Sequence, residues 1–160
     1  MKINRTHFIV GIIIIAILSR LIPHPPNFTP VTAVALFSII NFKNKYIAIS
    51  IPIICLFVSD LILGISLINL FVYFSFILIS GIGYLFGKIN LKSILLSSLI
   101  FFFVTNFGVW LIGYPKTLEG FITCYIAAIP FFGWTMAGDL FYSYSAKLSL
   151  NLFEKKLYIS

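Results

Sequence analysis

The chain is 160 residues long, and 61% of its residues are hydrophobic but only 9% are charged, with a formal net charge of +7. A soluble domain is usually about a quarter charged, and no water-soluble fold of this size hides so much apolar surface. The basic residues are scattered between apolar stretches without forming a basic face or arm, which excludes a nucleic-acid-binding protein and predicts an integral membrane protein.

Asparagine, lysine, glycine and proline residues divide the apolar sequence into six candidate transmembrane helices. A helix that crosses the bilayer needs about 20 apolar residues. The candidates cover residues 6–22, 29–42, 46–65, 67–87, 93–113 and 118–147. The second is short and is predicted to be a tilted or partial helix. No room remains for a soluble domain, so the predicted fold is a single all-α transmembrane domain, residues 1–160, built as a polytopic bundle of six helices.

The distribution of lysine and arginine near the helix ends predicts the orientation of this bundle. With the N-terminus inside, nine of the eleven cations fall on the cytoplasmic side, and only Arg20 and Lys116 fall outside. The nine are Lys2, Arg5, Lys43, Lys45, Lys88, Lys92, Lys147, Lys155 and Lys156. Because cytoplasmic loops carry the excess of positive residues, both termini are predicted to be cytoplasmic.

The connection between the first two helices is rich in proline, with four prolines among the eight residues from Pro23 to Pro30. Proline fixes φ and removes a hydrogen-bond donor, so a stiff, extended connector is expected. Thr29 is predicted to be the N-cap of the second helix, and Pro30 its first residue.

Three polar side chains belong to this outer region: Arg20 precedes the connector, and His24 and Asn27 lie in it. The second helix would present its free N–H groups and the positive end of its dipole toward the same side. Together these groups predict an anion-favouring mouth of a substrate site. The alternative for His24 is an ordinary solvated loop histidine.

Three ionisable residues fall inside the predicted helices, and each needs a partner or water. Arg20 and Asp60 are expected at a similar depth near the outer surface, so they either form an ion pair or hold a ligand. Asp139, seven residues before Ala146, is expected about 10 Å from the cytoplasmic end of its helix. At that depth it would not share a site with Asp60, and it is interpreted as a snorkelling or helix-pairing carboxylate near Lys147.

Asn106 and Trp110 are four residues apart in the fifth predicted helix and therefore project from one face. An amide beside an indole can hold a small planar or polar organic ligand. The alternative is an interhelical hydrogen bond together with an aromatic residue of the membrane interface.

Other chemistry is not indicated by the sequence. Cys55 and Cys124 lie in apolar runs and are predicted to be free, buried side chains. The two histidines, His7 and His24, belong to opposite faces, so no metal site is expected. No catalytic constellation or nucleotide-binding motif is visible, so we expect neither an enzyme nor a cofactor.

Four motifs carry a resemblance to an uncharacterised bacterial integral-membrane family. They are Arg20-x-x-Pro-His-Pro-Pro-Asn-Phe-Thr-Pro30, Ser59-Asp60-x-x-x-Gly64, Thr105-Asn-Phe-Gly-Val-Trp110 and Ile129-Pro-Phe-Phe132. The resemblance covers nearly the whole chain. It implies a multi-pass protein of the bacterial inner (plasma) membrane.

More distantly, the size, the six spans and the orientation are similar to the S components of energy-coupling factor (ECF) transporters. In those proteins six helices bind a vitamin or related micronutrient from outside, the loop between the first two helices gates the site, and a membrane coupling protein with two ATPases drives release. Two features differ. The first helix offers Gly11 and Ala16, and the second Ala33 and Ala35, without an Ala-x-x-x-Ala docking motif. The N-terminal Met-and-His pattern of nickel and cobalt S components is absent.

The leading hypothesis is therefore a substrate-binding subunit for uptake of a small organic micronutrient, such as a vitamin or precursor, in contact with membrane lipids. Its outward-facing pocket would be lined by Arg20, His24, Asn27, Asp60, Asn106 and Trp110. A proton-coupled secondary transporter is a second possibility, because Asp60 and Asp139 follow Pro52 and Pro130 at nearly equal spacing. A third is a non-transport membrane scaffold or assembly factor whose polar groups serve only helix pairing.

Overall fold

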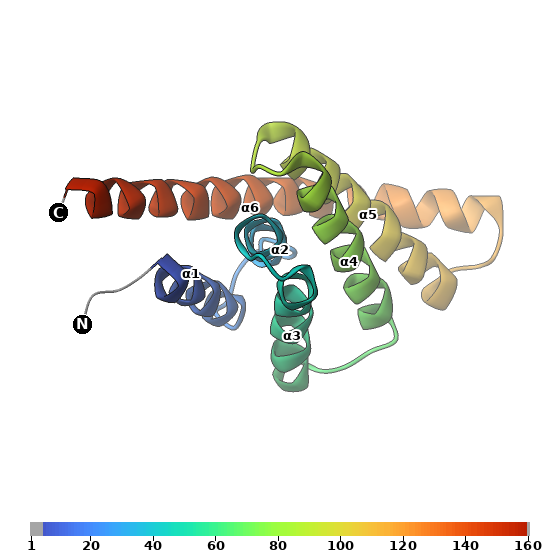
Figure 1. Cartoon of the computed structure of the whole chain (residues 1–160). Coiled ribbons are helices and arrows are strands. Elements are labelled where there is room, and N and C mark those ends of the chain that lie inside the picture. The colour runs from blue at the N-terminus through green and yellow to red at the C-terminus, as the bar shows by residue number, and fades with distance from the viewer. Residues whose placement is uncertain (1–4, 160) are drawn as a thin grey trace.

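The computed structural model describes the backbone of residues 5–159 and the side chains of residues 7, 9–11, 14, 15 and 18–155. Its elements are α1 (Arg5–Arg20), α2 (Val31–Asn41), α3 (Lys45–Leu63), α4 (Ile68–Phe86), α5 (Leu91–Gly113) and α6 (Leu118–Ile159). None of the residues 5–159 forms a β-strand. The predicted all-α fold is confirmed, and each predicted helix has a counterpart (Figure 1).

Some residues used in the predictions lie outside this description. They are the segment 1–4, which includes Lys2, and the side chains of Arg5, Ala16 and Lys156. Their parts in orientation and in docking on a partner therefore stay predictions.

Helix α2 is the centre of the molecule. Nine of its eleven residues, Val31 to Ile39, are buried, and it packs against each of the other five helices. Figure 1 shows it nearly end-on, between α1, α3 and α6. A helix that is apolar on all sides is expected to be buried on all sides. The short second segment is therefore the core of the bundle.

Helix length separates α1 and α2 from the rest. At 1.5 Å per residue, α1 with 16 residues and α2 with 11 extend about 24 and 16 Å, less than the roughly 30 Å hydrocarbon core of a bilayer. Within the described residues, the four helices α3 to α6 are long and apolar enough to cross a membrane. The arrangement with six spans and two cytoplasmic termini stays a prediction.

Helix α6 is longer than predicted. It continues past Lys147 to Ile159, which makes 42 residues and about 63 Å, roughly twice the hydrocarbon thickness. Figure 1 shows α6 running across the picture, whereas α3 runs from top to bottom, so the helices do not share one axis. The longer helix changes the position of Asp139, which lies near the middle of α6 and not near its end.

The start of α2 also differs from the prediction. Pro30 occupies the N-cap position with φ −80° and ψ 1°, no side chain caps the helix, and Val31 is its first residue. Thr29 as the N-cap was therefore wrong by one residue. By contrast, the Asn44 side chain accepts hydrogen bonds from the backbone N–H groups of Tyr46 and Ile47 at 3.0 and 3.2 Å, which starts α3 as a capping residue should.

The α1–α2 connector packs closely on α6 at Gly138. A Cβ atom at this position would lie 3.0 Å from the Phe28 Cα and 3.2 Å from the backbone N of Thr29. The Phe28 ring also packs against Phe141 and Tyr142, with ring centroids 6.0 and 5.5 Å apart. The Phe28 ring therefore holds the connector on the bundle, and the absence of a side chain at Gly138 allows the two backbones to approach closely.

Candidate functional site

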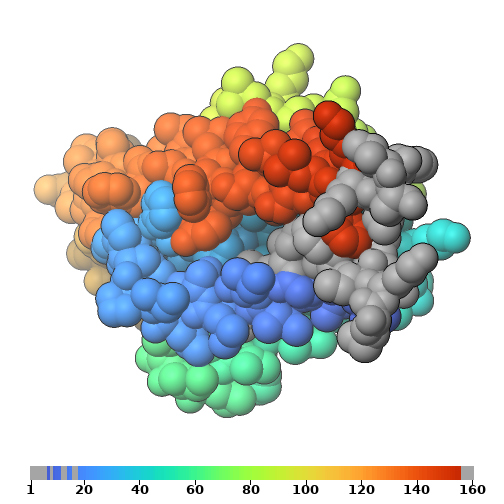
Figure 2. Space-filling view, turned by 90° about the vertical axis from the view of Figure 1, so that its left-hand side faces the viewer, coloured from blue at the N-terminus to red at the C-terminus, as the bar shows by residue number. Residues whose placement is uncertain are grey.

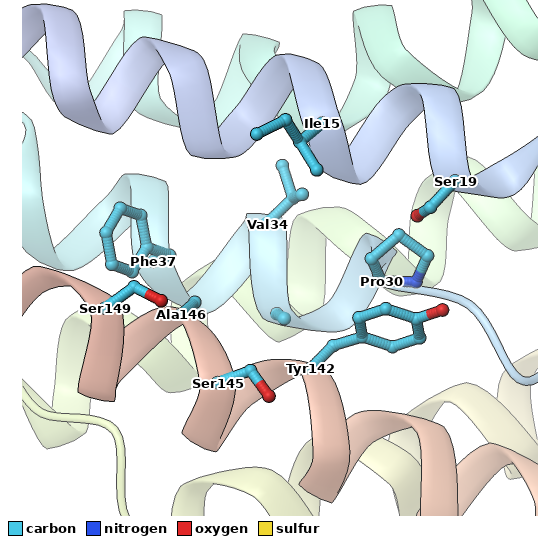
Figure 3. A pocket seen from close by; sticks show the side chains of 10 residues that line it. Ile15, Ser19, Pro30, Val34, Phe37, Tyr142, Ser145, Ala146 and Ser149 are labelled. Atoms are coloured by element: carbon cyan, nitrogen blue, oxygen red, sulfur yellow. The ribbon is translucent and has the colours of Figure 1, made fainter.

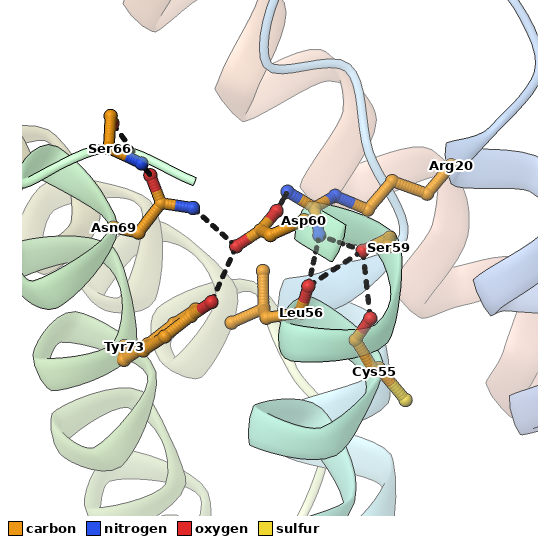
Figure 4. A network of polar contacts seen from close by, with 8 residues as sticks. All are labelled: Arg20, Cys55, Leu56, Ser59, Asp60, Ser66, Asn69 and Tyr73. Atoms are coloured by element: carbon orange, nitrogen blue, oxygen red, sulfur yellow. Dashed lines mark hydrogen bonds and ion pairs between the residues drawn. The ribbon is translucent and has the colours of Figure 1, made fainter. Parts of the chain in front are cut away.

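Arg20 at the end of α1 forms an ion pair with Asp60 near the end of α3 (Figure 4). Arg20 Nη2 lies 2.8 Å from Asp60 Oδ1. Arg20 Nη1 donates to the Ser59 hydroxyl and, at 3.3 Å, to the Leu56 carbonyl oxygen. The side chains of Arg20 and Asp60 are only 16% and 4% exposed. The predicted ion pair is confirmed, and at this low exposure an unpaired charge would be costly.

The second carboxylate oxygen of Asp60 binds α4. The Asn69 amide donates to Asp60 Oδ2 at 2.6 Å, and the Tyr73 hydroxyl does so at 2.8 Å. Asn69 in turn accepts hydrogen bonds from the backbone N–H and the hydroxyl of Ser66. Both oxygens of Asp60 are therefore occupied, and this carboxylate connects α1, α3 and α4 and orients the Arg20 guanidinium.

Three adjoining cavities lead from the α1–α2 connector into the bundle. The outer cavity has a volume of about 390 Å³, the middle cavity about 110 Å³ and the inner cavity about 170 Å³. Arg20, Asn27 and Thr29 line both the outer and the middle cavity. The middle and inner cavities share Asn27, Val72, Phe101 and Thr135. Because neighbouring cavities share lining residues, the three form one region, which has polar side chains inside an apolar bundle.

Asn27 lines all three cavities and therefore marks their junction. Its φ is 62°, and its carbonyl oxygen accepts a hydrogen bond from the Thr29 N–H at 2.9 Å. Asparagine adopts this left-handed conformation more readily than most residues with a side chain. The tight turn at Asn27 brings the proline-rich connector back over the cavities.

The other predicted residue of this connector, His24, lines the outer cavity. It is half-buried, and its Nδ1 lies 3.0 Å from the Pro25 carbonyl oxygen, to which it must donate. Nε2 therefore carries the lone pair in the neutral ring. The position of His24 at the outer end agrees with either a mouth residue or an ordinary loop histidine.

Asn106 and Trp110 are separated by the structure. Asn106 lines the inner cavity, and its Nδ2 donates to the Phe102 carbonyl oxygen at 2.7 Å. Trp110 lines none of the three cavities, because its Nε1 donates to the Pro115 carbonyl oxygen at 3.0 Å. The Lys116 Nζ lies 5.5 Å from the Trp110 ring centroid. The geometry therefore places the Trp110 side chain, at the end of α5, against the α5–α6 turn, and only Asn106 at the candidate site.

Asp139 lines the middle cavity together with Arg20. The residue is 2% exposed, and the Ser98 hydroxyl of α5 donates to its Oδ2 at 2.6 Å. Thr32 of α2 also hydrogen bonds to the carboxylate. Helix pairing by Asp139 is confirmed, whereas snorkelling near Lys147 was wrong, because Lys147 donates to the Ile89 carbonyl oxygen. Asp139 thus shares a cavity with Arg20, whereas Asp60 itself lines none of the three cavities.

Several lining residues were missed by sequence reasoning. Hydroxyl groups from α2, α5 and α6 and five phenylalanine rings complete the middle and inner cavities. They are Thr32, Thr105, Thr135, Phe76, Phe101, Phe102, Phe131 and Phe132. With 18 phenylalanines in the chain, no local pattern singles out these five. Thr105, Phe131 and Phe132 lie within two of the quoted motifs, which was the one available signal.

Comparison with known proteins identifies the family. A model of the DUF6580 family, described as a family of unknown function, matches residues 1–158. The chain belongs to this family. The expected membership of an uncharacterised family is thereby confirmed. No curated protein and no solved structure matches the chain.

A fourth cavity of this DUF6580 protein is different in character. It has a volume of about 210 Å³ and lies between α1, α2 and α6, with Ile15 and Ser19 above Val34 and Tyr142 in the close-up (Figure 3). Figure 2 shows the face on which α1 and α6 run beside each other. Among the residues whose side chains the structure describes, none that lines this cavity is charged. Its polar lining residues carry hydroxyl groups alone, whereas the region at Arg20 and Asp139 also presents charged side chains and is therefore the candidate site.

The described part of the DUF6580 chain offers little for metal or thiol chemistry. No group of three His, Cys, Asp or Glu side chains among these residues can hold a metal ion. Cys55 and Cys124 are free and buried, as predicted. The candidate site offers charged groups, amide and hydroxyl groups and aromatic faces for contact with a bound molecule.

Proposed function

We propose that this DUF6580 protein is a substrate-binding membrane subunit, similar to the S components of ECF transporters, for uptake of a small organic micronutrient. The observation that carries the proposal is the set of adjoining cavities lined by Arg20, Asn27, Asn106 and Asp139 inside an apolar helix bundle. Polar groups in such surroundings are costly unless they are paired or hydrogen-bonded, and ionisable groups inside a membrane protein commonly mark a substrate pathway. Binding of a polar solute would account for their gathering at these cavities.

The size of the region supports a small solute. The middle and inner cavities measure about 110 and 170 Å³, less than the roughly 300 to 1,000 Å³ of sites for drug-sized ligands. Arg20 faces this region from the outer end, while Asn106 lies in the inner part. A ligand of the size of a vitamin precursor would contact Arg20 at one end and Asn106 at the other.

The α1–α2 connector supports a gated site. It closes over the middle cavity through Asn27 and Thr29, and its Phe28 ring rests on α6. The ring contacts of Phe28 and the close approach to Gly138 hold the connector, and their release would open the middle cavity to the outer one. In this proposal the connector is the gate through which the substrate enters.

The proposal includes a location and partners. The protein would be a multi-pass protein of the bacterial inner (plasma) membrane with both termini cytoplasmic, in contact with membrane lipids and with an ECF coupling protein that carries two ATPases. The partner would not dock on the small residues of α2, because Ala33 and Ala35 are 3% and 0% exposed. Its docking surface would lie elsewhere on the bundle.

Native mass spectrometry of the detergent-purified protein tests the proposal. We expect a bound molecule of defined mass on the wild-type protein, and its loss in Asn106→Ala. Absence of any bound small molecule, even after incubation with cell extract, would contradict the proposal and favour a membrane scaffold or assembly factor.

One observation favours a second candidate, a proton-coupled secondary transporter. Asp139 is a buried carboxylate at the substrate cavity, which is where a coupling proton would bind. Uptake measured in proteoliposomes distinguishes the two. Accumulation driven by a pH gradient with this protein alone would establish the secondary transporter, because an S component requires its ATPases.

A further inference from the structure

The formal charges around the middle cavity do not cancel. The charge of Arg20 is matched by Asp60, whose two oxygens bind Arg20, Asn69 and Tyr73. Asp139 receives hydrogen bonds from the hydroxyls of Ser98 and Thr32, and no cation among the described residues pairs with it. When ionised, the Asp139 carboxylate is thus the charge at the cavity without a positive partner among the described residues, so it favours a positive ligand.

The hydroxyl groups of the walls point to the same kind of ligand. Thr105 Oγ1 donates to the Phe101 carbonyl oxygen at 2.7 Å, and Thr135 Oγ1 donates to the Phe131 carbonyl oxygen at 3.0 Å. A hydroxyl has one proton, so each of these oxygens can only accept a further hydrogen bond. A ligand with N–H donors matches walls that present acceptors.

Aromatic rings surround the rest of this space. Phe101 lines both cavities, Phe76 the middle one, and Phe102 and Phe132 the inner one. The ring centroids of Phe102 and Phe132 are 4.9 Å apart, and those of Phe76 and Phe101 are 5.6 Å apart. The negative faces of aromatic rings attract organic cations, and their apolar surface accommodates the remainder of such a ligand.

We infer that the ligand of the middle and inner cavities is a small organic cation whose ammonium group binds the Asp139 carboxylate and whose apolar part lies among the phenylalanine rings. This inference rests on the proposed function and names the substrate class for it. It replaces the anion-favouring mouth expected from Arg20, because Asp60 neutralises that side chain.

Three probes of nearly equal size and different charge test the inference: benzylammonium, benzyl alcohol and benzoate. Their affinities for the full-length protein in detergent are measured by isothermal titration calorimetry. We expect benzylammonium to bind at least about ten-fold more tightly than benzyl alcohol, and benzoate to bind most weakly, since a charge-assisted hydrogen bond is about twice as strong as a neutral one. This comparison uses the wild-type protein and needs no variant.

Asp139→Asn keeps the shape and the hydrogen-bond acceptor of the side chain but removes its charge. We expect it to weaken benzylammonium binding by about ten-fold or more and to change benzyl alcohol binding by less than about two-fold. Glu119→Gln is the matched control, because it removes an exposed carboxylate from the same helix and should leave all three affinities unchanged.

Equal or tighter binding of benzoate or benzyl alcohol by the wild-type protein would overturn the cation site. Unchanged benzylammonium affinity in folded Asp139→Asn, or binding of none of the probes, would overturn it as well. In each of these cases a co-purified small molecule of another charge, seen by native mass spectrometry, would leave the proposed binding function standing.

Discussion

Arg20 and Asp60 are 40 positions apart in the sequence, and their Nη2 and Oδ1 atoms lie 2.8 Å apart across the ends of α1 and α3. The carboxylate also binds Asn69 and Tyr73 of α4. One ion pair therefore joins three helices directly beside the outer and middle cavities. Its energetic role can be measured separately from ligand binding.

A double-mutant cycle measures this ion pair. Arg20→Gln and Asp60→Asn should each lower the free energy of unfolding, because either leaves an uncompensated charge in a site of low exposure. The double variant should be less destabilised than the sum, with a coupling energy of about 0.5 to 3 kcal/mol. Unfolding of the purified protein by SDS titration gives these values. Arg20→Gln combined with Glu119→Gln serves as the control and should be additive.

Gly138→Ala should loosen the α1–α2 connector. The added methyl group would lie 3.0 Å from the backbone of Phe28, so the connector must move, at a cost of about 1 to 3 kcal/mol in the free energy of unfolding. Faster proteolysis within residues 21–30 is the readout. Gly133→Ala in the same helix meets no atom within 4 Å and should be neutral or stabilising by up to about 1 kcal/mol. Equal behaviour of the two variants would contradict this account of the connector.

Asn106→Ala and Trp110→Ala should have different effects. Asn106 lines the inner cavity, so its truncation should weaken binding of the co-purified ligand by about 5- to 150-fold, corresponding to one buried hydrogen bond of about 1 to 3 kcal/mol. Trp110 packs against Phe107 and Phe121 outside the cavities, so its truncation should lower stability and leave affinity nearly unchanged. Ligand titration and thermal unfolding of both variants separate these effects. The reverse result would return Trp110 to the binding site.

The predicted orientation can be tested by cysteine labelling. Lys116→Cys should react with an impermeant maleimide added outside intact cells, whereas Lys43→Cys should react only after permeabilisation. Both native lysines are exposed, and the buried Cys55 and Cys124 should give little background. A reporter fused after Ser160 should be active in the cytoplasm. Reversed labelling of the two positions would overturn the orientation.

Much of the fold could be predicted because its signals are local. Runs of apolar residues separated by Asn, Lys, Gly and Pro located all six helices, since a helix satisfies its own backbone hydrogen bonds in an apolar medium. The Arg20 and Asp60 pair was foreseen for a related reason, because a charge at such a depth needs a partner.

The wrong predictions concern the ends of helices, where the local sequence pattern does not fix the helix boundary. The drop in hydropathy from Lys147 onward suggested that the last helix stops, yet α6 extends to Ile159, and Lys147 and Glu154 are good helix formers. Asp139 therefore moved from an apparent helix end to the middle. Likewise, Pro30 fits the N-cap position without a capping side chain, so Thr29 was not required there.

Composition and residue spacing are enough to predict that this chain forms apolar helices of the membrane type and that its few internal charges must be compensated. Which polar groups meet depends on the packing of the helices: Asp139 meets Ser98 beside the Arg20 cavity, and Trp110 meets Pro115 away from it. Such meetings depend on how helices far apart in the sequence cross and rotate. Close approaches such as that of Phe28 to Gly138 set this geometry, and no pattern within a single segment encodes them.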